Sequence, residues 1–277
     1  MAFIETHRSF VNTWQCDEND HMNVQFYFNN FAEAAEIFAL KYRIDRVQAS
    51  RPKVRHVRYL RELRGASSIV IKSAIIGDGE HSGSIIHIME NVGEGVVSAT
   101  ALDHCENPPT GIPTVNSADV AFALPRGIPA GFLPELDLEL LISQEKAITT
   151  NYGIIQPAQC NINGELLSQQ YISRISDGAS HLWDRLELTD EYLSENNYGR
   201  IAMEMKLSII EPVKSGAAVE VVSYCYGANE KTFTVRHQLR DLETGKAYAT
   251  MQVINIIFDL GKRKAVPVPD FLHKQYG

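Results

Sequence analysis

The chain has 277 residues, of which 44% are hydrophobic and 22% are charged, and its formal net charge is −8. This length allows one large domain or two small ones, and the composition excludes a wholly disordered or fibrous protein. The acidic balance disfavours a general nucleic-acid binder, and no apolar run reaches the ~18–20 residues that cross a bilayer. We therefore expect a globular protein that binds neither nucleic acid nor a membrane.

The cysteines and the N-terminal segment indicate in which cellular compartment the protein is expected. The four cysteines are scattered along the chain and form no C-x-x-C pair, and the first ten residues lack the long apolar stretch of a signal peptide. Disulfide frameworks are typical of oxidising compartments. We therefore expect a reduced, cytoplasmic protein.

A first helix is predicted directly after the polar segment Asp17–Asn23. Its apolar residues are spaced 4, 3, 4 and 3 positions apart, which matches a helical period of 3.6 residues. These residues are Val24, Phe28, Phe31, Ala35 and Phe38. Three strand-like segments follow, at Ser67–Ile76, Ser84–Glu90 and Gly95–Cys105.

A Pro-rich stretch, Glu106–Glu145, then carries six of the eleven prolines and has no clear period, apart from a short helix expected at Ser117–Leu124. A second helix is predicted from a stripe with spacings of 4, 4, 4, 3 and 4 that runs from Leu167 to Leu186. The strand-like segments after this helix are Ala218–Tyr226, Thr232–Arg240 and Lys246–Phe258.

The two halves resemble each other. At an offset of 144 residues, Cys16–Tyr27 aligns with Cys160–Tyr171 and shares a Cys, an Asn, a Gln and a Tyr with it. At an offset of 150 residues, His87 aligns with His237, and a glycine in the following turn also aligns. Because the order of the elements is the same as well, we infer a degenerate tandem duplication.

The densest polar cluster lies directly before the first helix. Asp17, Asn19 and His21 supply a carboxylate, an amide and an imidazole at positions i, i+2 and i+4. The helix start adds free N–H groups and a dipole that favour negative charge. These are the parts of an acyl-transfer or hydrolysis site: a base or nucleophile, an orienting group and oxyanion donors. Helix capping is the alternative interpretation, because Asp and Asn commonly precede helices.

The cluster belongs to a longer pattern, made up of Asp17, Asn19, His21, Met22, Asn23, Tyr27, Phe31, Glu33 and Ala34. This pattern resembles the signature of the hotdog-fold thioesterases, both the 4-hydroxybenzoyl-CoA thioesterase-like acyl-CoA thioesterases and the acyl-ACP thioesterases with two tandem hotdogs. The resemblance implies an α+β fold, a double hotdog in which a curved antiparallel sheet wraps a long helix in each half. The expected domains are an N-terminal hotdog with the Asp/Asn/His motif at 1–125, a Pro-rich linker at 126–145 and a C-terminal hotdog with a degenerate motif at 146–277.

The resemblance implies a thioester hydrolase that cleaves an acyl-CoA to a free acid and CoA. Asp17 would act as general base or nucleophile, and Asn19 and His21 would position it, the water or the carbonyl. Backbone N–H groups near Met22, Asn23 and Val24 would hold the oxyanion, and Tyr27 would orient the substrate. No residue spacing supports a metal site, and CoA, as part of the substrate, is the only cofactor expected. By analogy with other hotdog proteins, which often associate further, a homodimer is a possible assembly of this chain.

The sequence departs from the family in its second half, where Asn161 replaces Asp17 and Glu165 replaces His21. The acyl-ACP enzymes carry their working residues in the C-terminal hotdog, whereas this chain carries them in the N-terminal one. That difference favours the acyl-CoA thioesterases. An acyl-ACP thioesterase, a hotdog hydratase or dehydratase and a non-catalytic acyl-CoA-binding module remain alternatives.

A basic segment, Arg51–Arg64, has six Lys and Arg residues in fourteen positions of an otherwise acidic protein. Arg58 and Arg61 are the members for which we expect substrate binding, to the phosphates of CoA or to an acidic carrier protein. The alternative is a solvated strand edge on which positive charges discourage aggregation.

Overall fold

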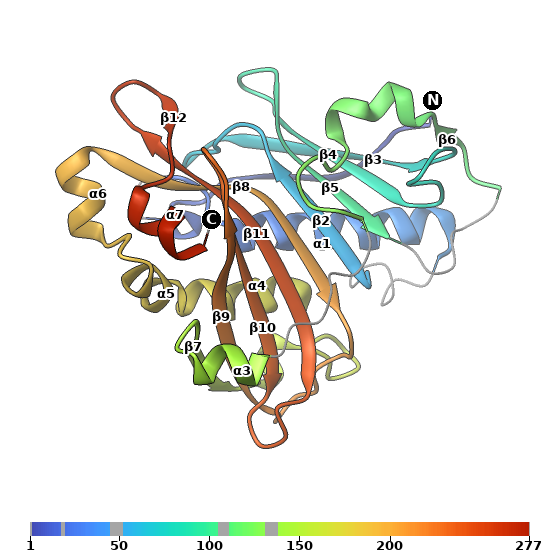
Figure 1. Ribbon diagram of the computed structural model, residues 1–277. Helices are drawn as coiled ribbons and strands as arrows, with labels where there is room; N and C mark the ends of the chain where they lie inside the picture. The colour runs from blue at the N-terminus through green and yellow to red at the C-terminus, as the bar shows by residue number, and fades with distance from the viewer. Residues whose placement is uncertain (1, 18–19, 45–51, 105–110, 131–137, 277) are drawn as a thin grey trace. The chain divides into compact units, whose positions relative to one another are not determined.

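The computed structural model describes residues 2–17, 20–44, 52–104, 111–130 and 138–276 (Figure 1). The chain divides into two compact units. The first comprises residues 1–126 with Leu167–Ile172, and the second comprises Gly127–Leu166 with Ser173–Gly277. In both halves a helical segment is followed by antiparallel strands, as the sequence predicts, and a strand precedes the helical segment.

The first unit contains a five-stranded antiparallel sheet in the order β1–β3–β4–β5–β2, and a short β6 lies parallel to β3. The long helix α1 packs against β1, β3 and β4 of this sheet (Figure 1). The bounds are β1 Ile4–Phe10, η1 Thr13–Gln15, α1 Val24–Tyr42, β2 Val54–Tyr59, β3 Ser68–Ile76, β4 Ile85–Asn91, β5 Val96–His104, β6 Thr114–Val115 and η2 Ser117–Ala123.

Strand β3 is largely apolar because α1 covers one face of the sheet and η2 covers the other. Ile75 packs on one face with Phe38 of α1. Ala74, its neighbour in sequence, packs on the other face with Val120 and Ala123 of η2. Successive side chains of a strand point to opposite faces, so a strand covered on both sides reads as a nearly continuous apolar run.

Helix α1 begins and ends where its sequence specifies. The Asn23 side chain accepts the N–H of Gln25 at 3.1 Å, which caps the N-terminus. The helix ends at Tyr42, and the next residue, Arg43, has a left-handed φ of 59° that stops the helical path. The predicted apolar stripe is confirmed, because Phe28, Phe31, Ala35 and Phe38 are all buried.

The second unit contains an equivalent antiparallel sheet in the order β8–β11–β10–β9–β7, with β12 beside β11. Helix α5 packs against β7, and α7 packs against β9. The bounds of the elements after residue 127 are α3 Leu138–Ser143, β7 Ala147–Ile154, η3 Pro157–Gln159, α4 Ser168–Asp177, α5 Ala179–Arg185, α6 Asp190–Asn196, β8 Tyr198–Ile209, β9 Ala218–Ala228, β10 Phe233–Asp241, β11 Ala247–Asp259, β12 Lys264–Val266 and α7 Asp270–Tyr276. The part of α4 up to Ile172 belongs to the first unit. All six predicted strands are confirmed to within two residues at each end.

One correction concerns the second helix, which the apolar stripe predicts as a single element. The structure divides it into α4 and α5 at Gly178. A Cβ atom at this position would lie 2.5 Å from the Thr150 carbonyl oxygen, so the backbones approach too closely for a side chain. The equivalent residue of α1 is Ala34, which is buried inside a continuous helix. None of the described helices is long and apolar enough to cross a membrane.

Candidate functional site

The loop Cys16–Met22 carries the expected catalytic residues and leads into α1. Its two ends are joined by an isolated β-bridge. The Asp17 N–H donates to the His21 carbonyl at 2.8 Å, and the Asp17 carboxylate accepts the His21 N–H at 3.1 Å. The structure therefore brings Asp17 and His21 together at the helix N-terminus, whereas Asn19 lies outside the described residues.

Glu62 is a further acidic residue at this loop. Its Oε2 lies 3.3 Å from Nε2 of His21, and both side chains are partly exposed to solvent. His21 also forms a backbone bridge with Arg64, which holds the two segments side by side. Glu62 was not predicted from the sequence, because the segment Arg51–Arg64 stands out for its positive charge. Glu62 is the only acidic residue in that segment, and this is the signal that would have found it.

The three backbone amides expected to hold an oxyanion differ in their partners. Met22 N–H donates to the Leu63 carbonyl at 2.7 Å, and Asn23 N–H donates to the Gln15 carbonyl at 2.8 Å. Val24 is the first residue of α1, where an N–H has no partner within the helix. Because the N–H groups of Met22 and Asn23 already have carbonyl partners, Val24 is the one of the three expected donors, all of them described residues, whose N–H remains for an oxyanion.

The surroundings of two titratable side chains at the loop, Tyr27 and Cys16, shift their pKa values. Tyr27 is buried, and its ring packs edge-on against the ring of Tyr59 with 5.1 Å between the centroids. Burial raises the pKa of Tyr27 well above its ordinary value, so its hydroxyl stays protonated. Desolvation, together with the charges of Asp20 and Asp17, also raises the pKa of the Cys16 thiol, which argues against a nucleophilic role for that residue.

The two arginines expected to bind substrate occupy different environments. Arg58 is buried on β2, and its Nη1 donates to the carbonyls of Phe122 and Leu124 at 2.7 Å each. This side chain anchors the segment that contains η2, and binding of a substrate anion would require it to change partners. Arg61 is exposed in the loop after β2. The alternative of a solvated strand edge is wrong for Arg58 and for the equally buried Arg55.

The second unit contains an equivalent loop, Cys160–Leu166, without the acid and the imidazole. The Asn161 N–H donates to the Glu165 carbonyl at 2.8 Å, and the Asn161 side chain accepts the Glu165 N–H at 3.1 Å. Asp17 makes the same two hydrogen bonds to His21 in the first unit. The Glu165 carboxylate forms an ion pair with Lys214 at 3.0 Å.

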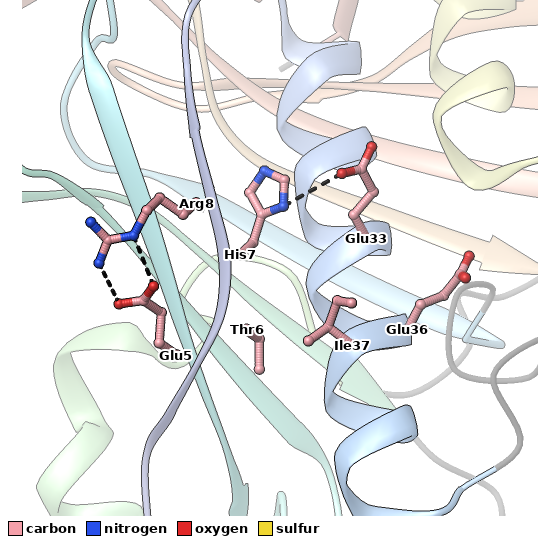
Figure 2. A pocket seen from close by; sticks show the side chains of 7 residues that line it. All are labelled: Glu5, Thr6, His7, Arg8, Glu33, Glu36 and Ile37. Atoms are coloured by element: carbon pink, nitrogen blue, oxygen red, sulfur yellow. Dashed lines mark hydrogen bonds and ion pairs between the residues drawn. The ribbon is translucent and has the colours of Figure 1, made fainter.

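A separate groove of about 480 Å³ lies between β1 and α1 (Figure 2). Nδ1 of His7 lies 3.4 Å from Oε2 of Glu33 across it. Burial is the largest influence on His7 and lowers its pKa, against the opposing charge of Glu33. Sequence reasoning missed His7, which stands in a strand with no motif around it. The lining of the groove contains none of the residues expected in the catalytic loop.

Comparison with known protein families gives one match. Residues 155–276 match the thioesterase-like superfamily. The matched segment is less than half of the chain, and it lies in the half with the degenerate motif. No curated protein matches the chain at a significant level.

Solved structures extend the comparison to the whole chain. A protein of Lactobacillus plantarum, assigned as an oleoyl thioesterase, has a TM-score of 0.60 at 11% identity and covers 96% of this chain and 97% of its own. An acyl-ACP thioesterase of Bacteroides thetaiotaomicron has a TM-score of 0.58 at 13% identity, with coverage of 92% and 98%. A 12:0-ACP thioesterase of Umbellularia californica has a TM-score of 0.57 at 10% identity, with coverage of 92% and 94%. The fold of this chain is thus hotdog-like, and its resemblance to the hotdog-fold thioesterases is confirmed.

Proposed function

We propose that the protein is a thioester hydrolase that cleaves an acyl-CoA to a free acid and CoA at the loop Cys16–Met22. The observation that carries this proposal is the placement of Asp17 and His21 on one hydrogen-bonded loop at the N-terminus of α1. Only the first unit has both groups, although the second unit has a loop with the same two hydrogen bonds. The match to the thioesterase-like superfamily supports the reaction type.

In the proposed reaction, Asp17 activates water as a general base or attacks the thioester carbonyl as a nucleophile. His21 and Asn19 orient Asp17, the water or the carbonyl. The Glu62 carboxylate, 3.3 Å from Nε2 of His21, orients the imidazole. The N–H of Val24 and the dipole of α1 stabilise the oxyanion that develops on the carbonyl oxygen. The reaction requires no cofactor apart from the CoA moiety of the substrate.

An acyl-ACP substrate is the second candidate. Two of the structures that match along the whole chain are described as ACP thioesterases. Arg61 and Arg64 are exposed beside the catalytic loop and would contact either the phosphates of CoA or the acidic surface of a carrier protein. Both substrates present the same thioester to Asp17, so the chemistry at the loop is the same.

The test is a thiol-release assay with a panel of acyl-CoA thioesters, from acetyl to oleoyl and benzoyl, beside the matching acyl-ACP thioesters. We expect Asp17→Asn to lower kcat by on the order of 10²–10⁴, because the amide keeps the loop hydrogen bond but can neither take a proton nor attack. The matched control is Asn161→Asp, which should leave turnover unchanged. Full activity in a folded Asp17→Asn protein, or no hydrolysis of any thioester, would contradict the proposal.

A further inference from the structure

A row of buried polar side chains crosses the whole sheet of the first unit. Each of its five strands contributes one residue, and every one of the side chains is at most 3% exposed. In spatial order these residues are Thr6 on β1, Ser73 on β3, His87 on β4, Asp103 on β5 and Arg55 on β2. A row of this kind costs desolvation energy and is tolerated only when its members satisfy one another.

The hydrogen bonds along the row are continuous. The hydroxyls of Thr6 and Ser73 are 2.7 Å apart, and Ser73 lies 2.7 Å from Nδ1 of His87. Nε2 of His87 lies 3.2 Å from the Asp103 carboxylate. Arg55 donates to both carboxylate oxygens of Asp103, at 2.7 Å and 2.6 Å. Burial alone would raise the pKa of Asp103, but the Arg55 and His87 contacts outweigh it and hold the pKa below its ordinary value.

The second unit repeats only part of this row. The hydroxyls of Thr150 and Ser223 are 2.9 Å apart, and Ser223 lies 2.8 Å from Nδ1 of His237. Val253 and Met205 occupy the positions of Asp103 and Arg55, and they pair across neighbouring strands as Asp103 and Arg55 do.

The second unit therefore forms the same sheet with an apolar pair at the end of its row. Replacing a buried ion pair by well-packed apolar residues is often neutral or stabilising. Stability of the sheet thus does not explain why the first unit keeps Arg55 and Asp103. One difference between the units that coincides with the pair is the loop that carries Asp17 and His21.

Arg55 links the row to the elements that form this loop. Its Nη1 donates to the Phe28 carbonyl at 3.3 Å, in the first part of α1. The chain that leaves β2 reaches Leu63, whose carbonyl accepts the N–H of Met22 at the loop end. One guanidinium therefore fixes the start of α1 relative to the strand that leads to Glu62 and the catalytic loop.

We propose that Arg55 and Asp103 are positioning residues for the catalytic loop: they hold the N-terminal part of α1 against β2, so that Val24 and Glu62 keep their places beside Asp17 and His21. Neither residue touches the substrate in this proposal. The proposal rests on the proposed thioesterase activity and deepens it, because it assigns the buried pair to catalysis rather than to folding.

The deciding variant is Arg55→Met with Asp103→Val, which installs the residues that the second unit carries. We expect a urea midpoint equal to or above that of the unmodified protein, and a kcat lower by about 10–100-fold with KM little changed. The substrate is the thioester of the panel that the unmodified protein cleaves fastest. The single variant Arg55→Met leaves Asp103 buried without its main partner, so its urea midpoint should fall below that of the double variant.

The matched control is Lys72→Met with Glu90→Val, which removes a partly exposed ion pair from the same sheet. Its kcat should equal that of the unmodified protein. Full kcat in a folded Arg55→Met/Asp103→Val protein would overturn the positioning role, and so would loss of folding, since the pair would then serve stability. In either case a low kcat for Asp17→Asn would leave the proposed function standing, whereas full activity of Asp17→Asn would remove that function itself.

Discussion

In the loops Cys16–Met22 and Cys160–Leu166, the second residue bonds twice to the residue four positions later. Asp17 does so in the first unit and Asn161 in the second, with the same two distances of 2.8 and 3.1 Å. Among the described residues of the two loops, Asp20 in the first and Gly164 in the second have a positive φ. One side-chain oxygen is enough to form this loop, so its shape does not require the charge of Asp17.

This comparison separates the fold of the loop from its chemistry. A carboxylate and an amide both accept the N–H of the later residue, so duplication preserves the backbone while the side chains change. Asp17 and His21 are therefore not explained by capping or by turn formation alone. Their presence in only one unit is what the capping interpretation leaves unexplained.

The largest effect is expected from exchanging the loop chemistry between the units. Asp17→Asn together with His21→Glu gives the first unit the polar pair of the second. We expect kcat to fall by about 10³-fold or more, since the carboxylate and the imidazole are both lost. The melting temperature should stay within a few degrees, because Asn161 and Glu165 form the same hydrogen bonds. Thiol release and thermal unfolding measure the two quantities.

The reverse exchange sharpens the comparison. Asn161→Asp together with Glu165→His places the acid and the imidazole in the second unit. Pro212 stands there at the position of Glu62, so the imidazole would have no equivalent carboxylate. No rescue of the first exchange is expected when both are combined. Recovered turnover in the combined variant would show that the loop alone suffices for activity and that Glu62 contributes nothing to it.

The helices that follow the two loops give the second prediction. Ala34 lies inside the continuous α1, whereas Gly178 separates α4 from α5. Gly178→Ala should lower the free energy of unfolding by about 1–3 kcal/mol, because its Cβ would overlap the Thr150 carbonyl. Urea unfolding followed by the fluorescence of Trp183, which packs on Phe233 in the second unit, measures this change.

The control for Gly178→Ala is Ala34→Gly in the first helix. No break is built into α1 at that position, so a smaller cost of about 1 kcal/mol is expected from the loss of helix propensity. Equal stability of Gly178→Ala and the unmodified protein would mean that the break between α4 and α5 is not imposed by the close approach of Thr150.

The sequence predicted the regular parts of this fold because they follow local patterns. The six strands and the start of α1 are set by apolar spacing, turn glycines and the Asn23 cap. The break at Gly178 was not predictable, since it depends on a backbone contact with Thr150, which is 28 positions away in the chain. Periodicity records which face is apolar, but it does not record how closely another strand approaches.

The candidate site was predicted in part for the same reason. Asp17 and His21 are four positions apart, and the loop between them is local. Glu62 reaches His21 only through the bridge between His21 and Arg64. The basic run around Arg55 and Arg58 suggested a solvated edge or a phosphate site, whereas both guanidinium groups are buried against a carboxylate or backbone carbonyls. A count of charges in sequence does not reveal which of them have an internal partner.

The last prediction concerns one of the two buried histidines, His87 and His237, at equivalent positions of the two units. His237 lies beside Ser223, and burial lowers its pKa to about 3. The folded second unit therefore keeps this imidazole neutral, while the unfolded chain protonates it below its ordinary pKa of ~6.5. Protonation of the unfolded chain therefore lowers the free energy of unfolding as the pH falls from ~6.5 towards 3, by up to about 1.4 kcal/mol per pH unit. Above pH ~6.5 the stability of the fold is not reduced in this way.

The variant His237→Asn retains a polar partner for Ser223 and removes the titration. Between pH 6 and 4, its unfolding free energy, measured through Trp183, should decline less steeply than that of the unmodified protein. The difference in slope corresponds to about one proton fewer taken up on unfolding. Gln238→Asn, at the next position of β10, is the control and should keep the original slope, because it removes no titratable group. An unchanged slope in His237→Asn would mean that the second unit protonates this histidine without unfolding.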